Sequence, residues 1–176
     1  MSRMQITTVV MAALTFCGCA STRVPMSYRI RDRYGLSDNQ LRRIPYFVSE
    51  PIVLGKEVPQ GKGKEDARMQ LAILDTGTPG LAEKIGDTEI LVSFEPGSRL
   101  MFVCLRPGME TSPWAVDTRY RLAPEGRDSG TKLGYYTYRG ERYFLLRGAG
   151  AYLMVRDKDI QPDVREVEYM KGRRAR

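Results

Sequence analysis

The chain has no histidine among its 176 residues. Histidine is the side chain whose charge changes most readily near neutral pH, and it is the base of Ser-His-Asp and Cys-His catalytic groups. Neither group can be assembled from this chain alone, and imidazole ligands for a metal are excluded too. We therefore expect a protein that is not an enzyme and that uses no cofactor and no metal.

The chain also lacks any strong excess of one class of residue. Hydrophobic residues make up 42% of the chain and charged residues 28%, which is typical of a globular protein and not of a disordered one. The length corresponds to one ordinary domain. The formal net charge of +7 favours an anionic partner but does not say which one.

The amino terminus contains a short apolar run. Residues 6–16 carry no charge and follow Arg3; the run has the length of a signal-peptide apolar region and is shorter than the about 20 residues that cross a bilayer. It leads into Gly18-Cys19-Ala20. This segment resembles the lipobox of bacterial lipoproteins, in which a small residue directly precedes the modified cysteine. Phe16 departs from the family, which usually has leucine there.

The lipobox resemblance implies that the signal peptide, residues 1–18, is cleaved between Gly18 and Cys19. It also implies a diacylglycerol on the Cys19 thiol, so that acyl chains such as palmitate anchor the protein to a membrane. Ala20 in place of aspartate implies the outer membrane, with the domain facing the periplasm. Cys17 would then be lost and the Cys19 thiol occupied, which leaves Cys104 alone and excludes an intramolecular disulfide.

The rest of the chain divides into three parts by composition. We expect a lipidated tether at residues 19–34, a single β-rich domain at residues 35–165 and a basic tail at residues 166–176. A short helix is predicted near the start of the domain, because Ser37 and Gln40 form a capping box. Pro45 should end or kink that helix.

Short strands with alternating apolar residues fill most of the domain. They are predicted at residues 52–58, 68–74, 89–94, 99–105, 114–122, 133–138, 142–147 and 151–156. Residues 99–105 are apolar on both faces, so this should be the most central strand, with Cys104 packed in the core. The prediction is a mainly β (β-rich α+β) fold, a small antiparallel sandwich or barrel preceded by one short helix.

Arginine and tyrosine alternate in several of these strands. The clearest cases are Arg119-Tyr120-Arg121 and Arg142-Tyr143. Such side chains can stack on sugars and pair with phosphates, which makes them a possible anionic-ligand surface. They are also ordinary residues for the solvated face of a sheet.

Three hypotheses about function remain. The first is a non-catalytic, outer-membrane-anchored lipoprotein that docks on other envelope proteins, as a component or accessory of a cell-envelope assembly. The second is a module that binds an anionic glycan, either peptidoglycan or lipopolysaccharide. The third is an enzyme that uses carboxylates only. Export makes nucleic acid an unsuitable partner.

The lipobox assignment predicts different effects for the two neighbouring cysteines. Cys19→Ser should abolish acylation and leave the precursor unprocessed, because the thiol that takes the lipid is gone, whereas Cys17→Ser should be processed normally. Metabolic labelling with a radioactive fatty acid measures both. Label that persists in the Cys19→Ser protein would contradict the assignment.

Overall fold

The computed structural model describes residues 22–58, 68–106, 117–131 and 133–161. In these residues the chain forms twelve strands and three short helices. The strands are β1 Arg23–Pro25, β2 Tyr46–Val48, β3 Ile52–Val58, β4 Arg68–Leu74, β5 Leu81–Ile85, β6 Glu89–Glu95, β7 Ser98–Val103, β8 Arg121–Ala123, β9 Gly126–Arg127, β10 Gly134–Tyr138, β11 Glu141–Arg147 and β12 Leu153–Arg156. The helices are α1 Tyr28–Arg33, α2 Asp38–Leu41 and α3 Asp157–Ile160.

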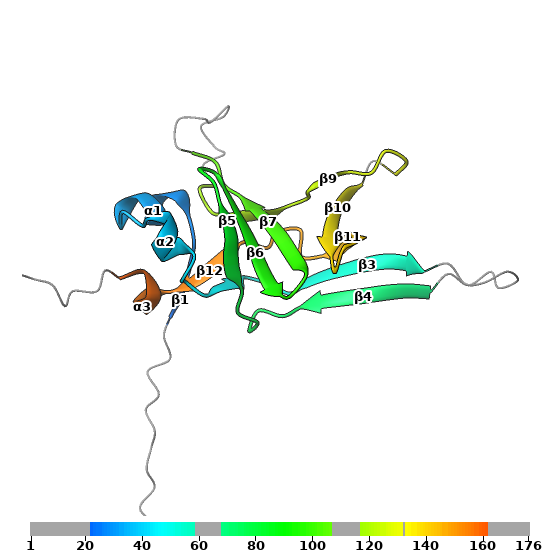
Figure 1. Cartoon of the computed structure of the whole chain (residues 1–176), viewed down its shortest axis with the longest axis horizontal. Helices are drawn as coiled ribbons and strands as arrows, with labels where there is room; N and C mark the ends of the chain where they lie inside the picture. The colour runs from blue at the N-terminus through cyan, green and yellow to red at the C-terminus, as the bar shows by residue number, and fades with distance from the viewer. Residues whose placement is uncertain (1–21, 59–67, 107–116, 132, 162–176) are drawn as a thin grey trace, which may run out of the picture.

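The strands form two antiparallel sheets. The small sheet has the order β1-β12-β2, and the large sheet has the order β4-β3-β11-β10-β7-β6-β5, with β8 added to β7 and β9 added to β10. Single bridges join the two sheets, at Tyr46 with Gly80 and at Arg121 with Tyr152. In Figure 1 the β3–β4 hairpin runs along one side of the molecule, while the helices gather at the opposite end. The predicted mainly β, antiparallel fold is confirmed.

The segment predicted as a tether belongs in large part to the domain. β1 pairs with β12, and α1 begins after Ser27, whose hydroxyl accepts a hydrogen bond from the Ile30 amide. Met26, between the two, is fully buried. The prediction of a tether at residues 19–34 is therefore wrong from Arg23 onward, because backbone pairing and the burial of Met26 and Ser27 hold this segment against the domain. Cys17, Gly18, Cys19 and the tail at residues 166–176 lie outside the described residues.

The predicted capping box is present. The Ser37 hydroxyl accepts from the Gln40 amide, and the Gln40 side chain accepts from the Ser37 amide at 2.9 Å. Leu36 and Leu41 are both buried beside it. The helix ends at Leu41, before Pro45, and is the only one of the three that was predicted.

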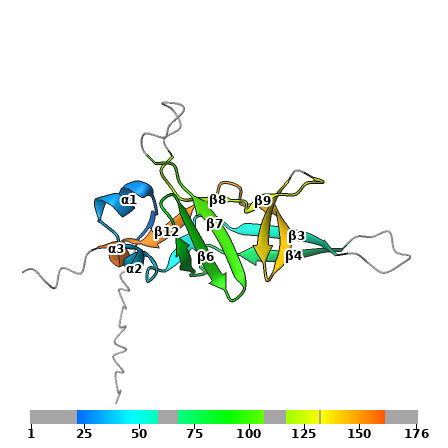
Figure 2. The same ribbon diagram turned by 45° about the horizontal axis from the view of Figure 1, so that its top comes forward.

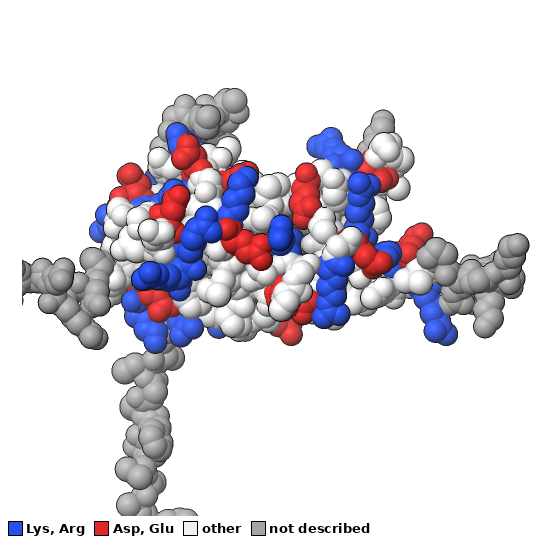
Figure 3. All heavy atoms as spheres, viewed as in Figure 1, with Lys and Arg blue, Asp and Glu red and all other residues white. Residues whose placement is uncertain are grey.

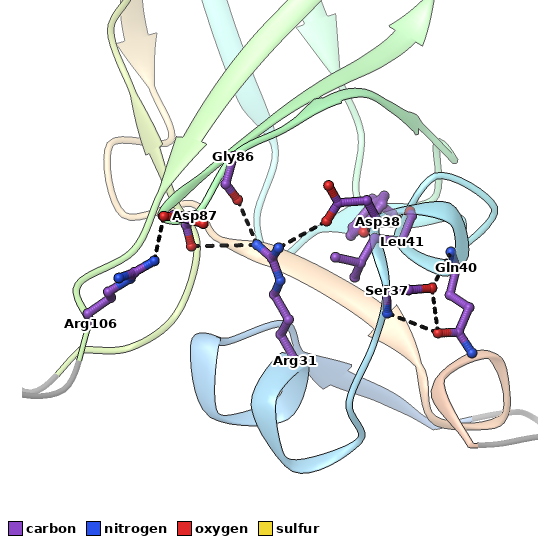
Figure 4. A network of polar contacts seen from close by, with 9 residues as sticks. Arg31, Ser37, Asp38, Gln40, Leu41, Gly86, Asp87 and Arg106 are labelled. Atoms are coloured by element: carbon purple, nitrogen blue, oxygen red, sulfur yellow. Dashed lines mark hydrogen bonds and ion pairs between the residues drawn. The ribbon is translucent and has the colours of Figure 1, made fainter.

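Arg31 fixes the helices against the large sheet (Figure 4). Its guanidinium donates to the Gly86 carbonyl at 2.6 Å, in the turn between β5 and β6, and to the Asp38 carboxylate of α2 at 3.0 Å. Asp87 in the same turn pairs with Arg106 at 2.6 Å. These paired charges line a polar hollow, and both guanidinium groups already have acidic partners.

β7 and the residue after it contribute three side chains to the core, and Cys104 packs there as predicted. β7 pairs with β6, β8 and β10, and Leu100, Phe102 and Cys104 on one side of this segment are buried. Burial raises the pKa of the Cys104 thiol, which keeps it protonated and unreactive. In the part of the chain that the structure describes, no helix is long and apolar enough to cross a membrane.

Phe102→Ala should lower the free energy of unfolding by about 3–5 kcal/mol, since Phe102 is fully buried and its removal leaves a cavity. Leu133→Ala is the control, because Leu133 is 56% exposed and such changes stay within about 0.5 kcal/mol. Denaturant titration measures both. Equal losses in the two variants would contradict this position for Phe102.

Candidate functional site

Two residues of the predicted arginine–tyrosine surface, Tyr120 and Tyr143, do not lie on the surface. Tyr120 is fully buried and Tyr143 is almost so. Burial raises the pKa of Tyr120 to about 12, and the Tyr143 ring packs edge-on against Tyr138 with 5.4 Å between centroids. Both rings are part of the core, so the prediction that they are exposed for stacking on a ligand is wrong.

Arg119 and Arg121 lie together on the surface, around one carboxylate. The Arg119 guanidinium donates to both carboxylate oxygens of Asp117, at 2.7 and 2.8 Å, and Arg121 pairs with the same carboxylate. The hydrogen bonds from Arg119 hold the pKa of Asp117 well below its usual range. Arg119 also stacks on Tyr152, 4.5 Å from the ring centroid.

Arg142 lies on a different hairpin, on β11. It stacks on Tyr135 of β10, 4.6 Å from the ring centroid. On the face shown in Figure 3, basic and acidic side chains are interspersed. Arg121 lies opposite Val103 at one end of β7, whereas Arg142 follows the β10–β11 turn, where Tyr138 pairs with Ser98 at the other end of β7. Strand pairing therefore places Arg142 apart from Arg119 and Arg121.

A different surface stands out, on the outer side of β3, β4 and β11. Four of its side chains are large, apolar and at least half exposed. They are Met69 at 50%, Leu71 at 53%, Ile73 at 63% and Leu146 at 51%. We call these four residues the apolar face.

Strand register holds the members of the apolar face together. Met69, Leu71 and Ile73 alternate along β4, so they project to the same side, and they lie opposite Glu57, Gly55 and Val53 of β3. A Cβ atom at Gly55 would stand 2.6 Å from Leu146 Cδ1 and 3.0 Å from Met69 Sδ. Leu146 and Met69 therefore close over the bare backbone of Gly55, and the apolar face is continuous from β11 to β4.

The other side of the same hairpin faces the interior. Leu54, Ala72 and Leu74 line a hollow of about 200 Å³ together with Phe94 and Leu100. β4 thus contacts the core mainly through Ala72 and Leu74; Ile73 also borders the hollow but is 63% exposed. The apolar outer side of β4 has no covering element among the described residues, and isolated exposed apolar residues are common whereas contiguous ones mark interaction sites.

The sequence predicts the strand at residues 68–74, in which Met69, Leu71 and Ile73 alternate with smaller or polar residues, but it does not predict the environment of these three side chains. An alternating apolar stripe indicates a half-buried strand, which by itself points the stripe toward the core. Here the core side is taken by Ala72 and Leu74. The alternation of arginine and tyrosine gave a wrong prediction for Tyr120 and Tyr143 for the same reason. Alternation along a strand separates its two faces but does not say which face is exposed to water.

The pH dependence of stability should report on the cluster around Asp117. Its carboxylate pKa is lower in the folded protein than in the unfolded chain, so its contribution is complete above about pH 5 and is lost as the pH falls further. Asp117→Asn should therefore lower the unfolding free energy at pH 7 and flatten its decline between about pH 5 and 2. Urea titrations at several pH values measure this. The same decline in both proteins would contradict it.

Among the described residues, no group of three or more acidic or cysteine side chains is placed to hold a metal ion. No family model, no curated protein and no solved structure matches the chain.

Proposed function

We propose that the protein is a non-catalytic lipoprotein, anchored in the outer membrane through Cys19, that docks on another envelope protein through its apolar face. It serves as a component or accessory of a cell-envelope assembly. The single observation that carries the docking function is the contiguous, half-exposed apolar face on β4 and β11. The lipobox supports the anchor.

The chemistry of the apolar face favours a protein partner. Three aliphatic side chains and a methionine present no hydrogen-bond donor to a sugar or a phosphate, whereas burial of apolar area is the main driving force of protein association. Methionine adapts its shape to a partner because its side chain is unbranched and flexible. Glu57, which lies directly opposite Met69 on β3, is exposed and supplies polar surface at the margin of the apolar face, as expected for the rim of an interface.

The anionic-glycan alternative has less support. Its two proposed stacking rings, Tyr120 and Tyr143, are buried. Arg119 and Arg121 share the carboxylate of Asp117, so part of their charge is neutralised. A phosphate or carboxylate ligand would have to compete with that pairing.

A charge placed on the apolar face should weaken docking. Leu146→Lys is expected to weaken the partner complex at least about tenfold, because an apolar contact is replaced by a charge that must be desolvated. The measurement is copurification of the affinity-tagged, membrane-extracted protein with discrete envelope proteins. Retention of the same partner by Leu146→Lys would contradict the proposal.

Leu133→Lys is the matched control, since Leu133 is a leucine of similar exposure outside the apolar face. It should copurify the same partner as the wild type. Sedimentation with purified sacculi and with lipopolysaccharide tests the alternative. Salt-sensitive sedimentation that Leu146→Lys leaves unchanged, without any protein partner, would favour glycan binding over docking.

A further inference from the structure

The two edge strands of the large sheet, β5 and β4, differ in how they are protected from pairing with another chain. At one end, β5 is covered: the Arg42 guanidinium donates to the Glu83 carbonyl, and Gly80 forms a bridge with Tyr46 of the small sheet. A register shift between Ala82 and Lys84 further distorts this strand. Covering, bulges and charges are the usual means by which an edge strand is kept from pairing with another chain.

At the other end, β4 carries none of these features. Its seven residues pair with β3 in unbroken register, from Leu74 opposite Ile52 to Arg68 opposite Val58. Among the described strands β3 is its only partner, and β4 forms the margin of the sheet in Figures 1 and 2. It contains no proline, and Arg68 is its only charged residue. Its outer row of backbone amides and carbonyls is therefore available for pairing.

We infer that β4 pairs with β4 of a second copy of this chain, antiparallel and centred on Leu71, so that two large sheets join into one. The two-fold axis passes through the Leu71 pair. Each copy then uses the same surface, as in most closed dimers, and each covers the bare edge of the other.

The residues of β4 are self-complementary in this register. Met69 of one copy lies opposite Ile73 of the other, Leu71 lies opposite Leu71, and Gln70 lies opposite Ala72. Directly opposite side chains of an antiparallel pair share one face and contact each other. All three apolar pairs therefore fall on the outer side, where they join the two apolar faces into one surface of double width.

The charges fit the same register. Arg68 of one copy lies opposite Leu74 of the other, which leaves the two Arg68 side chains about six residues, or roughly 20 Å, apart along the strands. Over that distance the repulsion of exposed charges is screened, since the Debye length is about 8 Å at physiological ionic strength. No like charges meet across the pair.

A cysteine scan of β4 tests the register. At the two-fold axis the Cα atoms of the two copies lie about 4.5–5.5 Å apart, which suits a disulfide. Leu71→Cys in the membrane-extracted protein should give a disulfide-linked dimer on mild oxidation, seen as doubled mass on a non-reducing gel. Gln70→Cys should not, because its equivalent lies two residues further along the strand. The unsubstituted protein gives the background from native cysteines.

A second pair of variants tests association without a covalent link. Leu71→Lys places two like charges directly opposite each other and should convert the dimer to a monomer in sedimentation analysis. Leu81→Lys is the matched control, since Leu81 is 55% exposed on β5 at the covered end of the same sheet, and it should remain a dimer. Both proteins should keep the wild-type fold, seen as an unchanged far-UV circular dichroism spectrum, because both positions are on the surface.

The outcomes separate the possible occupants of β4. A monomeric wild type without a Leu71→Cys dimer would overturn the inference, and so would a Leu71→Cys disulfide to a different protein. Equal dimerisation of the Leu71→Lys and Leu81→Lys proteins would also overturn it. The inference does not depend on the lipid anchor or on the Leu146 contact, so either can fail in its own test while the dimer is confirmed.

Discussion

The fold depends on the burial of one side chain, Tyr120, where the two sheets meet. Its amide donates to the Met26 carbonyl at the end of β1, and its carbonyl accepts from the Leu153 amide of β12. The fully buried ring lies near the Cys104 thiol and the Arg31 guanidinium, and its hydroxyl makes no hydrogen bond of normal geometry. One residue thus joins the first strand, the last strand, the end of β7 and α1. An unpaired hydroxyl in this position costs free energy, which the packing of the ring offsets.

This arrangement explains why the two halves of the molecule differ. Around Tyr120 the small sheet, the helices and β5 to β8 enclose one another, and most of the buried side chains gather there. The β3–β4 hairpin leaves this region and is covered on one side only. An antiparallel sheet can have one solvated face, but that face is then normally polar. The apolar face of β4 breaks this rule, and such local exceptions are expected where a protein binds something.

Much of the local structure could be predicted from the sequence. Ser37 and Gln40 specify their capping box by chemistry that needs no other part of the chain. Arg139 and Gly140 take positive φ angles of 51° and 77°, as the tight turn between β10 and β11 requires. The alternation of apolar residues predicts the bounds of β3, β4 and β6 closely. In each case the determining interactions lie within a few residues.

Features that depend on distant residues could not be predicted in the same way. β1 is three residues long and exists only because β12, more than a hundred residues later, pairs with it. α1 contains no buried residue, so it has no apolar periodicity to detect. The side on which Tyr120 and Leu71 lie depends on which neighbours pack against each strand. The alternation of side chains along a strand does not determine which of its two faces is buried.

The pairing of β1 with β12 sets a limit on distance if Cys19 carries the lipid. Strand β1 begins at Arg23, four residues after that cysteine, and four residues span at most about 14 Å even when fully extended. The domain would then be held close to the lipid head groups, with the β1 end of the small sheet nearest to them. Under that condition a partner would have to approach the membrane to be bound, because so short a link would not let the domain reach away from it.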